Sequence, residues 1–311
     1  MTPRRYNQAM TDAVIEARAL RKSYGNLEAL KGIDLTVRRG EVFCLLGPNG
    51  AGKTTTVEIL EGHRDYDSGE VRVFGHDPAS RERSFRERIG IVSQASSVER
   101  FLTVEEVVEL FRGYYPHPRP LGQILEIMGL SEKRASLVRR LSGGQVRRLD
   151  VALALAGDPD LLFLDEPTSG FDPTARRDAW EMVRGLSDLG KTILLTTHYL
   201  DEAERLSDRL AVIVNGDIAA RGTVESLRAG RGRTLISFRA PRDALPNAIL
   251  EAAMTRDGRV SIETDEPTRA LHRLTGWATE AGTELEELRV QPTSLEDIYL
   301  RLVAAQAGPE E

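Results

Sequence analysis

Apolar and polar residues alternate along the first third of the chain, which is the pattern of half-buried strands. The stretches VIEARALRKSYG, from residue 14, and LEALKGIDLTVRRGEVFCLLG, from residue 27, both alternate in this way. Period-two alternation places one face of a strand on the core and the other in solvent, as in many antiparallel sheets. EVRVFG and RIGIVSQ predict two further short strands. We therefore expect an antiparallel layer that leads into the first strand of the core.

Between about residues 95 and 145 the spacing of apolar residues changes to that of helices. In TVEEVVELFRGYY, Thr103 is followed three residues later by Glu106, which is the signature of a capping box at a helix start. A second helical stretch, LGQILEIMGL, follows the proline-rich loop YPHPRP. These patterns predict a helical subdomain over about 95–145.

From residue 157 onward, short apolar runs alternate with amphipathic stretches. The apolar runs are LLFLDEP, KTILLTTH and RLAVIVNG, and the amphipathic stretches between them are TARRDAWEMVRGLSDLG and YLDEAERLSD. Strands that alternate with helices imply a parallel sheet with both faces covered. This part of the chain therefore predicts an α/β fold.

The remainder of the chain predicts a small second domain. The stretch Gly230-Arg231-Gly232 predicts a linker, and three strand-like stretches follow it, TLISFRA, GRVSIET and ELEELRV. Helical patterns separate them at 243–253 and 267–281, and SLEDIYLRLVAA predicts a last helix. We expect two domains, residues 12–229 and an α+β domain of residues 233–305.

The composition is that of an ordinary globular protein and excludes several kinds of function. The 311 residues carry a formal charge of −6, which argues against a dedicated nucleic-acid binder because such proteins concentrate basic side chains. The one cysteine, Cys44, lies in an apolar strand, so neither a disulfide framework nor a thiolate metal site can form within the chain. We expect Cys44 to pack as a small hydrophobic residue.

The hydropathy pattern predicts no membrane-spanning segment. No apolar run approaches the 18 residues of a spanning helix, and the first 14 residues hold no signal-peptide core. We therefore expect a chain that is soluble by itself, so that any membrane-spanning part would come from another polypeptide.

The stretch LLGPNGAGKTTTVEIL, which begins at Leu45, places three glycines between an apolar strand and a helix. Glycine lets backbone N–H groups approach an anion, and the helix that starts near Lys53 directs its N-terminus at the same point. Lys53 can then reach the β- and γ-phosphates of a nucleotide, while the Thr54 hydroxyl can ligate Mg²⁺. The predicted nucleotide-binding residues are Gly47, Pro48, Asn49, Gly50, Ala51, Gly52, Lys53, Thr54 and Thr55.

Polar side chains follow several predicted strands at the edge where this loop should lie. Asp165 and Glu166 end LLFLDEP before its proline, so Asp165 can hold Mg²⁺ and Glu166 can polarise the water that attacks the γ-phosphate. His198 ends TILLTTH and can contact the γ-phosphate or orient that water. Gln94, at the end of IVSQ, can reach Mg²⁺ or the water, and Tyr24 can stack on an adenine ring.

A second glycine-containing turn, LSGGQ, precedes the helical run VRRLDVALALAG. Its residues are Leu141, Ser142, Gly143, Gly144 and Gln145. The turn offers another helix N-terminus to an anion, yet it lies 20 residues before Asp165. One nucleotide rarely needs two γ-phosphate cradles from one chain. Two chains arranged head to tail would use both, with two ATP molecules buried between them.

These motifs occur in an order that gives residues about 14–222 a resemblance to the ATP-binding subunit of an ABC transporter. In that family GPNGAGKTT corresponds to the Walker A loop, Gln94 to the Q-loop, LSGGQ to the signature and LLFLDEP to the Walker B strand. SGFD with Asp172 corresponds to the D-loop, His198 to the switch histidine and Tyr24 to the adenine platform. The resemblance implies ATP and Mg²⁺ as cofactors. It also implies a P-loop NTPase fold with a mixed core sheet, an antiparallel β layer and a helical subdomain.

Details beyond the shared motifs narrow the resemblance. THYLDEAE, PTSLEDIYL and the short tail domain resemble the daunorubicin-resistance type of exporter ATPase. The chain departs from the family pattern in two places. Val146 stands where a basic residue is common after the signature, and Phe171 replaces the usual leucine of the D-loop. Neither is a phosphate-binding group, so ATP hydrolysis is still expected.

The resemblance implies an ATP-hydrolysing motor subunit, peripheral to the cytoplasmic face of the cell membrane. Its expected partners are a separate integral-membrane permease and a second cassette, either another copy of this chain or a homologue. The transported small molecule would contact the permease, and no nucleic-acid partner is expected. A drug or other amphiphile is the favoured substrate, while lipids and glycans stay open.

Two other functions remain as alternatives. Importer ATPases share every motif named above, and only the tail favours export. Soluble ABC ATPases of translation or DNA repair usually carry two cassettes, coiled-coil insertions or zinc-binding cysteines, whereas this chain has one cassette and one cysteine. We therefore expect an exporter ATPase, with an importer ATPase as the alternative and a non-transport ATPase behind it.

Overall fold

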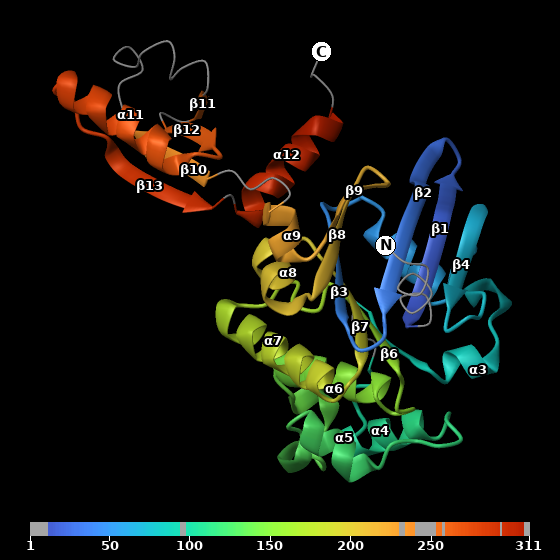
Figure 1. The fold of residues 1–311 in the computed structure, drawn as a ribbon. Coiled ribbons are helices and arrows are strands. Elements are labelled where there is room, and N and C mark those ends of the chain that lie inside the picture. Colours follow the sequence, from blue (N-terminus) through green and yellow to red (C-terminus); the bar gives the residue numbers. More distant parts are fainter. Residues whose placement is uncertain are drawn as a thin grey trace. The chain divides into compact units, whose positions relative to one another are not determined.

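The structure is a computed structural model that describes residues 12–93, 98–229, 234–239, 253–256, 259–292 and 294–307. The chain divides into two compact units, Met1–Thr223 and Val224–Glu311, whose elements are labelled in Figure 1. The short helix α9 (Val224–Ala229) thereby falls in the second unit. The limits expected for the two domains, 12–229 and 233–305, stay predictions.

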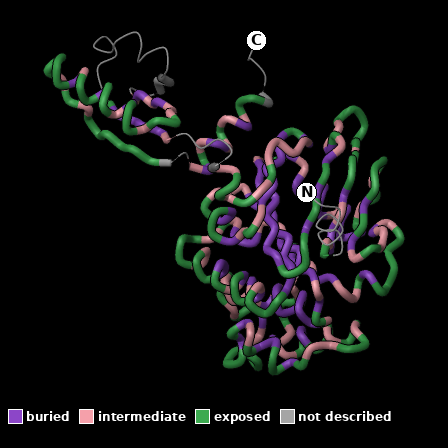
Figure 2. Tube along the Cα trace, viewed as in Figure 1, coloured by how far each residue is buried: buried purple, intermediate pink, exposed green. Residues whose placement is uncertain are grey.

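A six-stranded sheet forms the centre of the first unit. Its order is β5-β6-β7-β3-β8-β9, and every neighbouring pair is parallel except β8 and β9. β3 and β7 are buried throughout (Figure 2), as expected of strands that are covered on both faces. The predicted α/β fold with a mixed core sheet is confirmed. The strands are β3 (Val42–Leu46), β5 (Ile89–Val92), β6 (Leu161–Asp165), β7 (Thr192–Thr197), β8 (Arg209–Val214) and β9 (Asp217–Gly222).

A three-stranded antiparallel sheet packs on this core. Its order is β2-β1-β4, with β1 at Ala13–Tyr24, β2 at Leu27–Arg38 and β4 at Ser68–Val73, and Figure 1 shows the three strands side by side. Apolar residues of this sheet share one buried cluster with Phe43 of β3 and Phe163 of β6. The predicted antiparallel layer is therefore confirmed.

The helices of the first unit either flank the core sheet or pack against one another. α4 begins with the predicted capping box, because Thr103 Oγ1 accepts from the Glu106 N–H at 3.2 Å and the Thr103 N–H donates to the Glu106 carboxylate at 2.7 Å. α4 contacts α5 and α6, which confirms a helical group. The helices are α2 (Lys53–Leu60), α3 (Arg83–Arg86), α4 (Val104–Arg112), α5 (Leu121–Ile127), α6 (Gly143–Ala154), α7 (Pro173–Asp188) and α8 (Leu200–Leu206), with 3₁₀ turns η1 (Pro78–Ser80), η2 (Ser131–Lys133) and η3 (Val138–Arg140).

The second unit is a small α+β arrangement, as predicted. Its antiparallel sheet has the order β11-β12-β10-β13, and α11 packs on that sheet through a buried cluster that includes Phe238 and Leu274. The helix predicted at 243–253 lies outside the described residues up to 252, and residue 253 begins strand β11 instead. The elements after α9 are β10 (Thr234–Arg239), β11 (Ala253–Arg256), β12 (Arg259–Thr264), α11 (Pro267–Glu280), β13 (Glu286–Pro292) and α12 (Leu295–Ala307).

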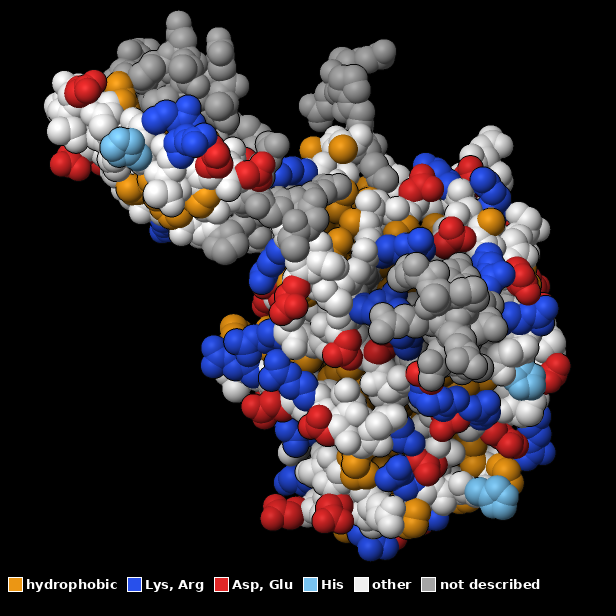
Figure 3. All heavy atoms as spheres, in the orientation of Figure 1, with side chains coloured by type: hydrophobic (Ala, Val, Ile, Leu, Met, Phe, Trp, Pro, Cys, Tyr) orange, Lys and Arg blue, Asp and Glu red, His pale blue; other side chains and the backbone are white. Residues whose placement is uncertain are grey.

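Three features of the structure match what the composition and hydropathy predicted: the character of the helices, the mixture of surface charges and the burial of Cys44. None of the helices that the structure describes combines the length and the apolar character needed to cross a lipid bilayer. On the face of the first unit seen in Figure 3, basic and acidic side chains are interspersed. Cys44 is buried in β3, and burial raises the pKa of its thiol, so the side chain packs as a neutral hydrophobic group.

Candidate functional site

The glycine-rich loop between β3 and α2 lies so close to its neighbours that two of its positions require glycine. A Cβ at Gly47 would lie 2.3 Å from the Ile213 carbonyl oxygen, and a Cβ at Gly52 would lie 2.8 Å from the Ala29 carbonyl oxygen. Gly52 also has a φ of +106°, in the region that favours glycine. The Gly47 N–H donates to the Thr197 carbonyl at 3.2 Å, which connects the loop to the end of β7.

Lys53 begins α2 and places its ammonium group inside this loop. The side chain is 5% exposed, and Nζ donates to the carbonyls of Gly47 at 2.9 Å and Pro48 at 3.2 Å. Nζ also lies 3.4 Å from Oε1 of Glu166. Thr54 is exposed on the same first turn of the helix. The loop thus gathers an ammonium group, a hydroxyl group and a helix N-terminus where a phosphate chain can bind.

The two acids at the end of β6 are held by one threonine of the neighbouring strand. Thr196 of β7 donates from Oγ1 to Asp165 Oδ1 at 2.5 Å and accepts from the Glu166 N–H at 3.0 Å. Glu166 has a φ of +45°, a left-handed conformation that costs energy in a residue with a Cβ. The chain therefore turns sharply at Glu166 instead of extending the strand.

His198 meets the same acid from the end of β7. Its Nδ1 lies 3.2 Å from Glu166 Oε1, the oxygen that also faces Lys53. The imidazole packs on the ring of Tyr199 with a centroid separation of 4.0 Å. The structure therefore brings Lys53, Glu166 and His198 together from α2, the end of β6 and the end of β7.

Of two other residues expected at the nucleotide, the structure describes Tyr24 but not Gln94. Tyr24 ends β1 and is 39% exposed, and the charged groups of Arg64 and Lys22 lie 5.2 Å and 5.7 Å from its ring centroid. Such an exposed aromatic face is able to stack on a base. Gln94 lies outside the described residues.

The LSGGQ turn forms the start of α6. Ser142 is the N-cap: its Oγ accepts from the Gln145 N–H at 3.3 Å, and the Ser142 N–H donates to Gln145 Oε1 at 3.0 Å. The serine–glutamine capping box was readable in the sequence, which has the required spacing. Asp172 caps α7 by accepting from Thr174 N at 2.8 Å and Ala175 N at 2.9 Å. Both caps line one hollow of about 650 Å³.

Arg147 is a buried residue of the site that the sequence analysis missed. Its guanidinium group donates to the carbonyls of Ser93 at 2.6 Å, Pro167 at 3.3 Å and Asp165 at 3.4 Å. Burial lowers the pKa of Arg147 from its ordinary value. The side chain thus joins the helix of the LSGGQ turn to the end of β6 and to the segment after β5. In the sequence it is one of two adjacent arginines, which look like surface residues.

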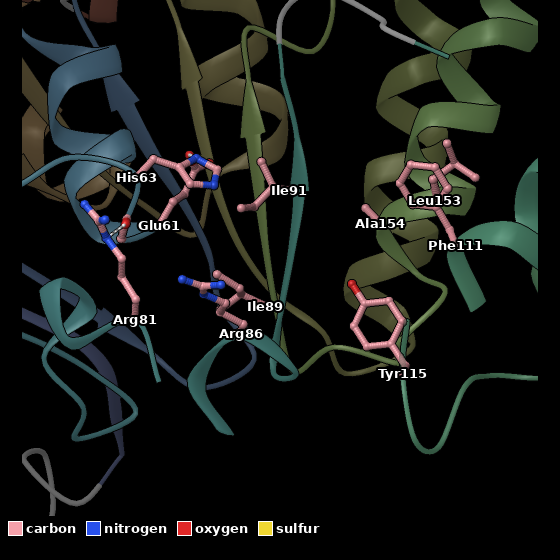
Figure 4. Close-up of a pocket in the computed structure, with 11 residues that line it drawn as sticks. Glu61, His63, Arg81, Arg86, Ile89, Ile91, Phe111, Tyr115, Leu153 and Ala154 are labelled. Atoms are coloured by element: carbon pink, nitrogen blue, oxygen red, sulfur yellow. Dashed lines mark hydrogen bonds and ion pairs between the residues drawn. The ribbon is translucent and has the colours of Figure 1, made fainter. Parts of the chain in front are cut away.

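A second cavity, of about 500 Å³, opens on the side of β5 (Figure 4). Charged side chains form one wall and mostly apolar side chains the other, with Ile89 and Ile91 of β5 between them. Burial raises the pKa of Glu61, and the hydrogen bond from His63 to Glu61 raises the pKa of His63. The charged wall holds Glu61, His63, Arg81 and Arg86, and the opposite wall holds Phe111, Tyr115, Leu153 and Ala154.

The fold and the first site together define a P-loop ATPase. Residues 30–169 match the family described as ABC transporter, and residues 234–294 match the ABC transporter domain-containing protein-like C-terminal domain. The chain is 38% identical to the daunorubicin/doxorubicin resistance ATP-binding protein DrrA of Streptomyces peucetius, with 94% of this chain and 93% of that protein covered. It is 39% identical to the Nod factor export ATP-binding protein I of Burkholderia lata, with 96% and 99% covered.

Solved structures agree with these relatives. The structure of an ATP-binding subunit of an ABC transporter superposes with a TM-score of 0.63 at 28% identity, over 70% of this chain and 92% of that one. A dimeric post-hydrolysis state of an ATP-binding cassette, bound to ADP and Pi, superposes with a TM-score of 0.59 at 25% identity, over 67% and 98%. The chain belongs to the ATP-binding subunits of ABC transporters, and it hydrolyses ATP to drive transport. The predicted family and enzyme class are confirmed.

Proposed function

We propose that this chain is the motor subunit of an exporter and that it works as a head-to-tail dimer with a separate integral-membrane permease. Both relatives carry names of resistance or export, which supports export over import. The transported molecule is then an amphiphile such as an antibiotic, and it contacts the permease. In this arrangement the chain lies at the cytoplasmic face of the membrane, and residues 233–305 form an accessory domain.

The observation that carries the proposal is the Glu166 carboxylate between Lys53 and His198. In the structure Lys53 pairs with Glu166 and with loop carbonyls. When ATP binds, the phosphates replace these partners of the ammonium group. Glu166 can then accept a proton from the water that attacks the γ-phosphorus, while the bond to the ADP leaving group breaks. His198 orients this water or the γ-phosphate, and Tyr24 stacks on the adenine.

The residues at the loop fit Mg²⁺. Within the described ranges, no three His, Cys, Asp or Glu side chains are grouped as a metal site. Mg²⁺ is commonly bound by one or two protein oxygens together with substrate phosphates and water, so a full protein cage is not needed. We assign Thr54 and Asp165 as its protein ligands, with Gln94 as a third. When bound, the ion neutralises charge on the β- and γ-phosphates.

The LSGGQ turn is assigned to the ATP of the partner chain. The Ser142 hydroxyl accepts from Gln145, which leaves its proton free to be donated to a phosphate oxygen. The dimeric cassette bound to ADP and Pi supports such a pairing. Leu141, Gly143 and Gly144 shape the same turn, and Asp172 lines the same hollow from the start of α7.

The second cavity is assigned to the permease. Its charged wall comes from the segment after α2, and its apolar wall comes from the helical group (Figure 4). A permease segment seated there would contact both parts at once. Closure of the cassettes would then move the permease.

Transport in vesicles tests the proposed function. Inside-out vesicles that contain the chain and the membrane protein encoded beside its gene should accumulate daunorubicin only when ATP is present. Vesicles with Glu166→Gln in place of the wild-type chain are the matched control and should accumulate none. ATP-driven uptake of a solute by right-side-out vesicles, without export, would contradict the proposal and favour an importer.

A further inference from the structure

A fully buried carboxyl group lies beside the site and has no part in the chemistry above. Glu202, on α8, is 0% exposed. The Trp180 indole N–H, on α7, donates to its Oε1 at 3.2 Å. Its other oxygen, Oε2, has no hydrogen-bond partner among the residues that the structure describes. A buried polar atom without a partner is costly, so such a group calls for an explanation.

Two buried threonines are the other neighbours of this carboxyl group. Burial raises the pKa of Glu202, and the neighbouring polar groups of Thr197, Thr168 and Trp180 oppose that rise without cancelling it. The Thr168 hydroxyl is a second buried oxygen that lacks a close partner within the described part of the chain. A proton on Oε2 can be donated to this hydroxyl, which gives both oxygens a partner at once.

These neighbours belong to three segments that carry site residues. Thr168 lies two residues after Glu166, in the loop that leaves β6. Thr197 ends β7 and directly precedes His198. Trp180 belongs to α7, the helix that begins at the edge of the hollow beside the LSGGQ turn. The Glu202 side chain therefore lies beside three segments: the loop that follows Glu166, the end of β7 that precedes His198, and helix α7, which begins at the hollow beside the LSGGQ turn.

We propose that Glu202 is a positioning residue for ATP hydrolysis. Its neutral carboxyl group joins the loop after Glu166, the end of β7 and α7, and so holds Glu166 and His198 at their observed separation. The inference rests on the proposed function, in which these two residues act on the attacking water. Loss of Glu202 leaves the hydrogen bonds of Lys53 to the nucleotide-binding loop in place, so it should lower kcat and leave KM for ATP nearly unchanged.

Three variants of the full-length chain test this role. Glu202→Gln keeps the acceptor for Trp180 and a donor for Thr168, so kcat should stay within about threefold of wild type. Glu202→Leu keeps the volume and removes both contacts, so kcat should fall at least about tenfold, since small displacements of reacting groups are costly. Trp180→Phe removes the indole N–H and leaves a smaller aromatic ring, and it should lower kcat by less than Glu202→Leu. KM for ATP should stay within about threefold in all three.

Ser207→Ala is the matched control at the end of the same helix. Its hydroxyl donates to the Ala203 carbonyl of the same helix, so its removal should leave kcat at the wild-type value. Circular dichroism and the midpoint of thermal unfolding verify that each variant is folded. If Glu202→Leu does not fold, the other two variants still test the positioning role. It requires a kcat near wild type in Glu202→Gln and a lower kcat in Trp180→Phe.

Several results would overturn the positioning role. These are wild-type kcat in a folded Glu202→Leu, a fall in Glu202→Gln as large as in Glu202→Leu, or a rise in KM without a change in kcat. A second comparison separates this proposal from the proposed function. In a Glu166→Gln background, Glu202→Leu should lower the residual rate little further, because the base is already absent. If Glu166→Gln alone hydrolyses ATP at the wild-type rate, the assignment of the base fails, whatever the Glu202 variants show.

Discussion

At the scale of single residues, the position of Glu166 decides its chemistry. Its backbone adopts a left-handed φ of +45°, and its N–H is held by Thr196. One carboxylate oxygen faces both Lys53 and His198. Asp165, one residue earlier, instead accepts a hydrogen bond from Thr196 at the strand end. Two adjacent acids therefore have different surroundings, which supports the proposed roles of Asp165 at Mg²⁺ and of Glu166 at the attacking water.

The first prediction concerns this difference. Glu166→Gln keeps the size of the side chain and removes the base, so kcat should fall by about 10²–10⁴. ATP affinity should change by no more than about threefold, because the loop around Lys53 is untouched. The variant should accumulate as an ATP-bound dimer on a sizing column. Single-turnover hydrolysis and nucleotide titration measure the two effects separately.

Two further variants serve as comparisons. Lys53→Ala should weaken ATP binding itself, since the ammonium group that meets the phosphates is lost. His198→Ala should lower kcat, but less than Glu166→Gln does. If kcat fell more in His198→Ala than in Glu166→Gln, His198 would be the base.

At the scale of elements, the proposed function gives two tasks to one hydroxyl group at the start of α6. Ser142 Oγ stabilises the helix by accepting from the Gln145 N–H. The hydroxyl proton is not used in that bond, and the proposed function assigns it to a phosphate of the partner's ATP. The two tasks use opposite sides of the same hydrogen-bonding group and can be separated by substitution.

The second prediction separates these tasks. Ser142→Ala should cost about 1 kcal/mol of stability through the lost cap and should also weaken ATP-driven dimerisation. Ser142→Asp keeps a capping oxygen but offers no donor and brings a negative charge to the phosphate. The Ser142→Asp variant should keep the wild-type unfolding temperature but should no longer form the ATP-bound dimer. Sizing chromatography in the Glu166→Gln background and thermal unfolding measure both; a normal dimer in Ser142→Asp would exclude the phosphate contact.

The third prediction concerns the pH dependence of stability at α8. Because the pKa of Glu202 is raised on folding above its ordinary 4.5, the folded state binds the proton more tightly than the unfolded state. This contribution is present below pH 4.5 and is lost as pH rises through the folded pKa. Glu202→Gln does not titrate, so its unfolding temperature relative to wild type should rise as pH increases above 4.5. The charged neighbours Asp201 and Arg147 are unchanged in both proteins.

Glu106 provides a control of opposite sign. Hydrogen bonds in the capping box lower the pKa of Glu106, so its contribution is gained as pH rises toward 4.5. Glu106→Gln should therefore fall in unfolding temperature relative to wild type over that range and then stay level. If the unfolding temperatures of Glu202→Gln and Glu106→Gln, each relative to wild type, changed with pH in the same way, the raised pKa of Glu202 and the lowered pKa of Glu106 would both be contradicted.

At the scale of the whole molecule, the chain is two compact units with separate cores. Every described residue that we assign to the nucleotide lies in the first unit. The C-terminal match covers residues 234–294 and lies within the second. We therefore expect the second unit to influence the dimer or the permease instead of the phosphate chemistry.

The fourth prediction follows from this separation. Truncation after residue 230 should leave ATP affinity within about threefold of the full chain, because every described residue assigned to the nucleotide belongs to the first unit. Titration with a fluorescent ATP analogue measures it, and circular dichroism verifies folding. A folded truncation that no longer binds ATP would show that the second unit supports the site.

The fifth prediction concerns assembly. If each complete site needs the LSGGQ turn of a partner chain, ATP hydrolysis per chain should rise with protein concentration until dimers predominate. A rate per chain that stays constant in a verified monomer would exclude the shared site.

Much of this protein was determined by the sequence alone, because its signals are local. Period-two alternation and strand–helix alternation predicted the two sheets of the first unit, and the spacing of Thr103 and Glu106 predicted a capping box. The loop around Lys53 was recognisable because phosphate binding needs glycines, a lysine and a helix start within a few residues. The strand at 253–256 was not predicted, since a short stretch after a helical pattern carries little periodicity of its own.

Only the tertiary structure decided which polar side chains are buried and what they touch. In the sequence, Glu202 has acidic residues close by on both sides, Asp201 and Glu204, and therefore looks like part of a solvated helix face. It becomes a fully buried group because Trp180 of α7 packs against it. Arg147 likewise reaches three carbonyls on distant segments. A pattern along one element reports that element's own burial, whereas such contacts depend on how separate elements pack together.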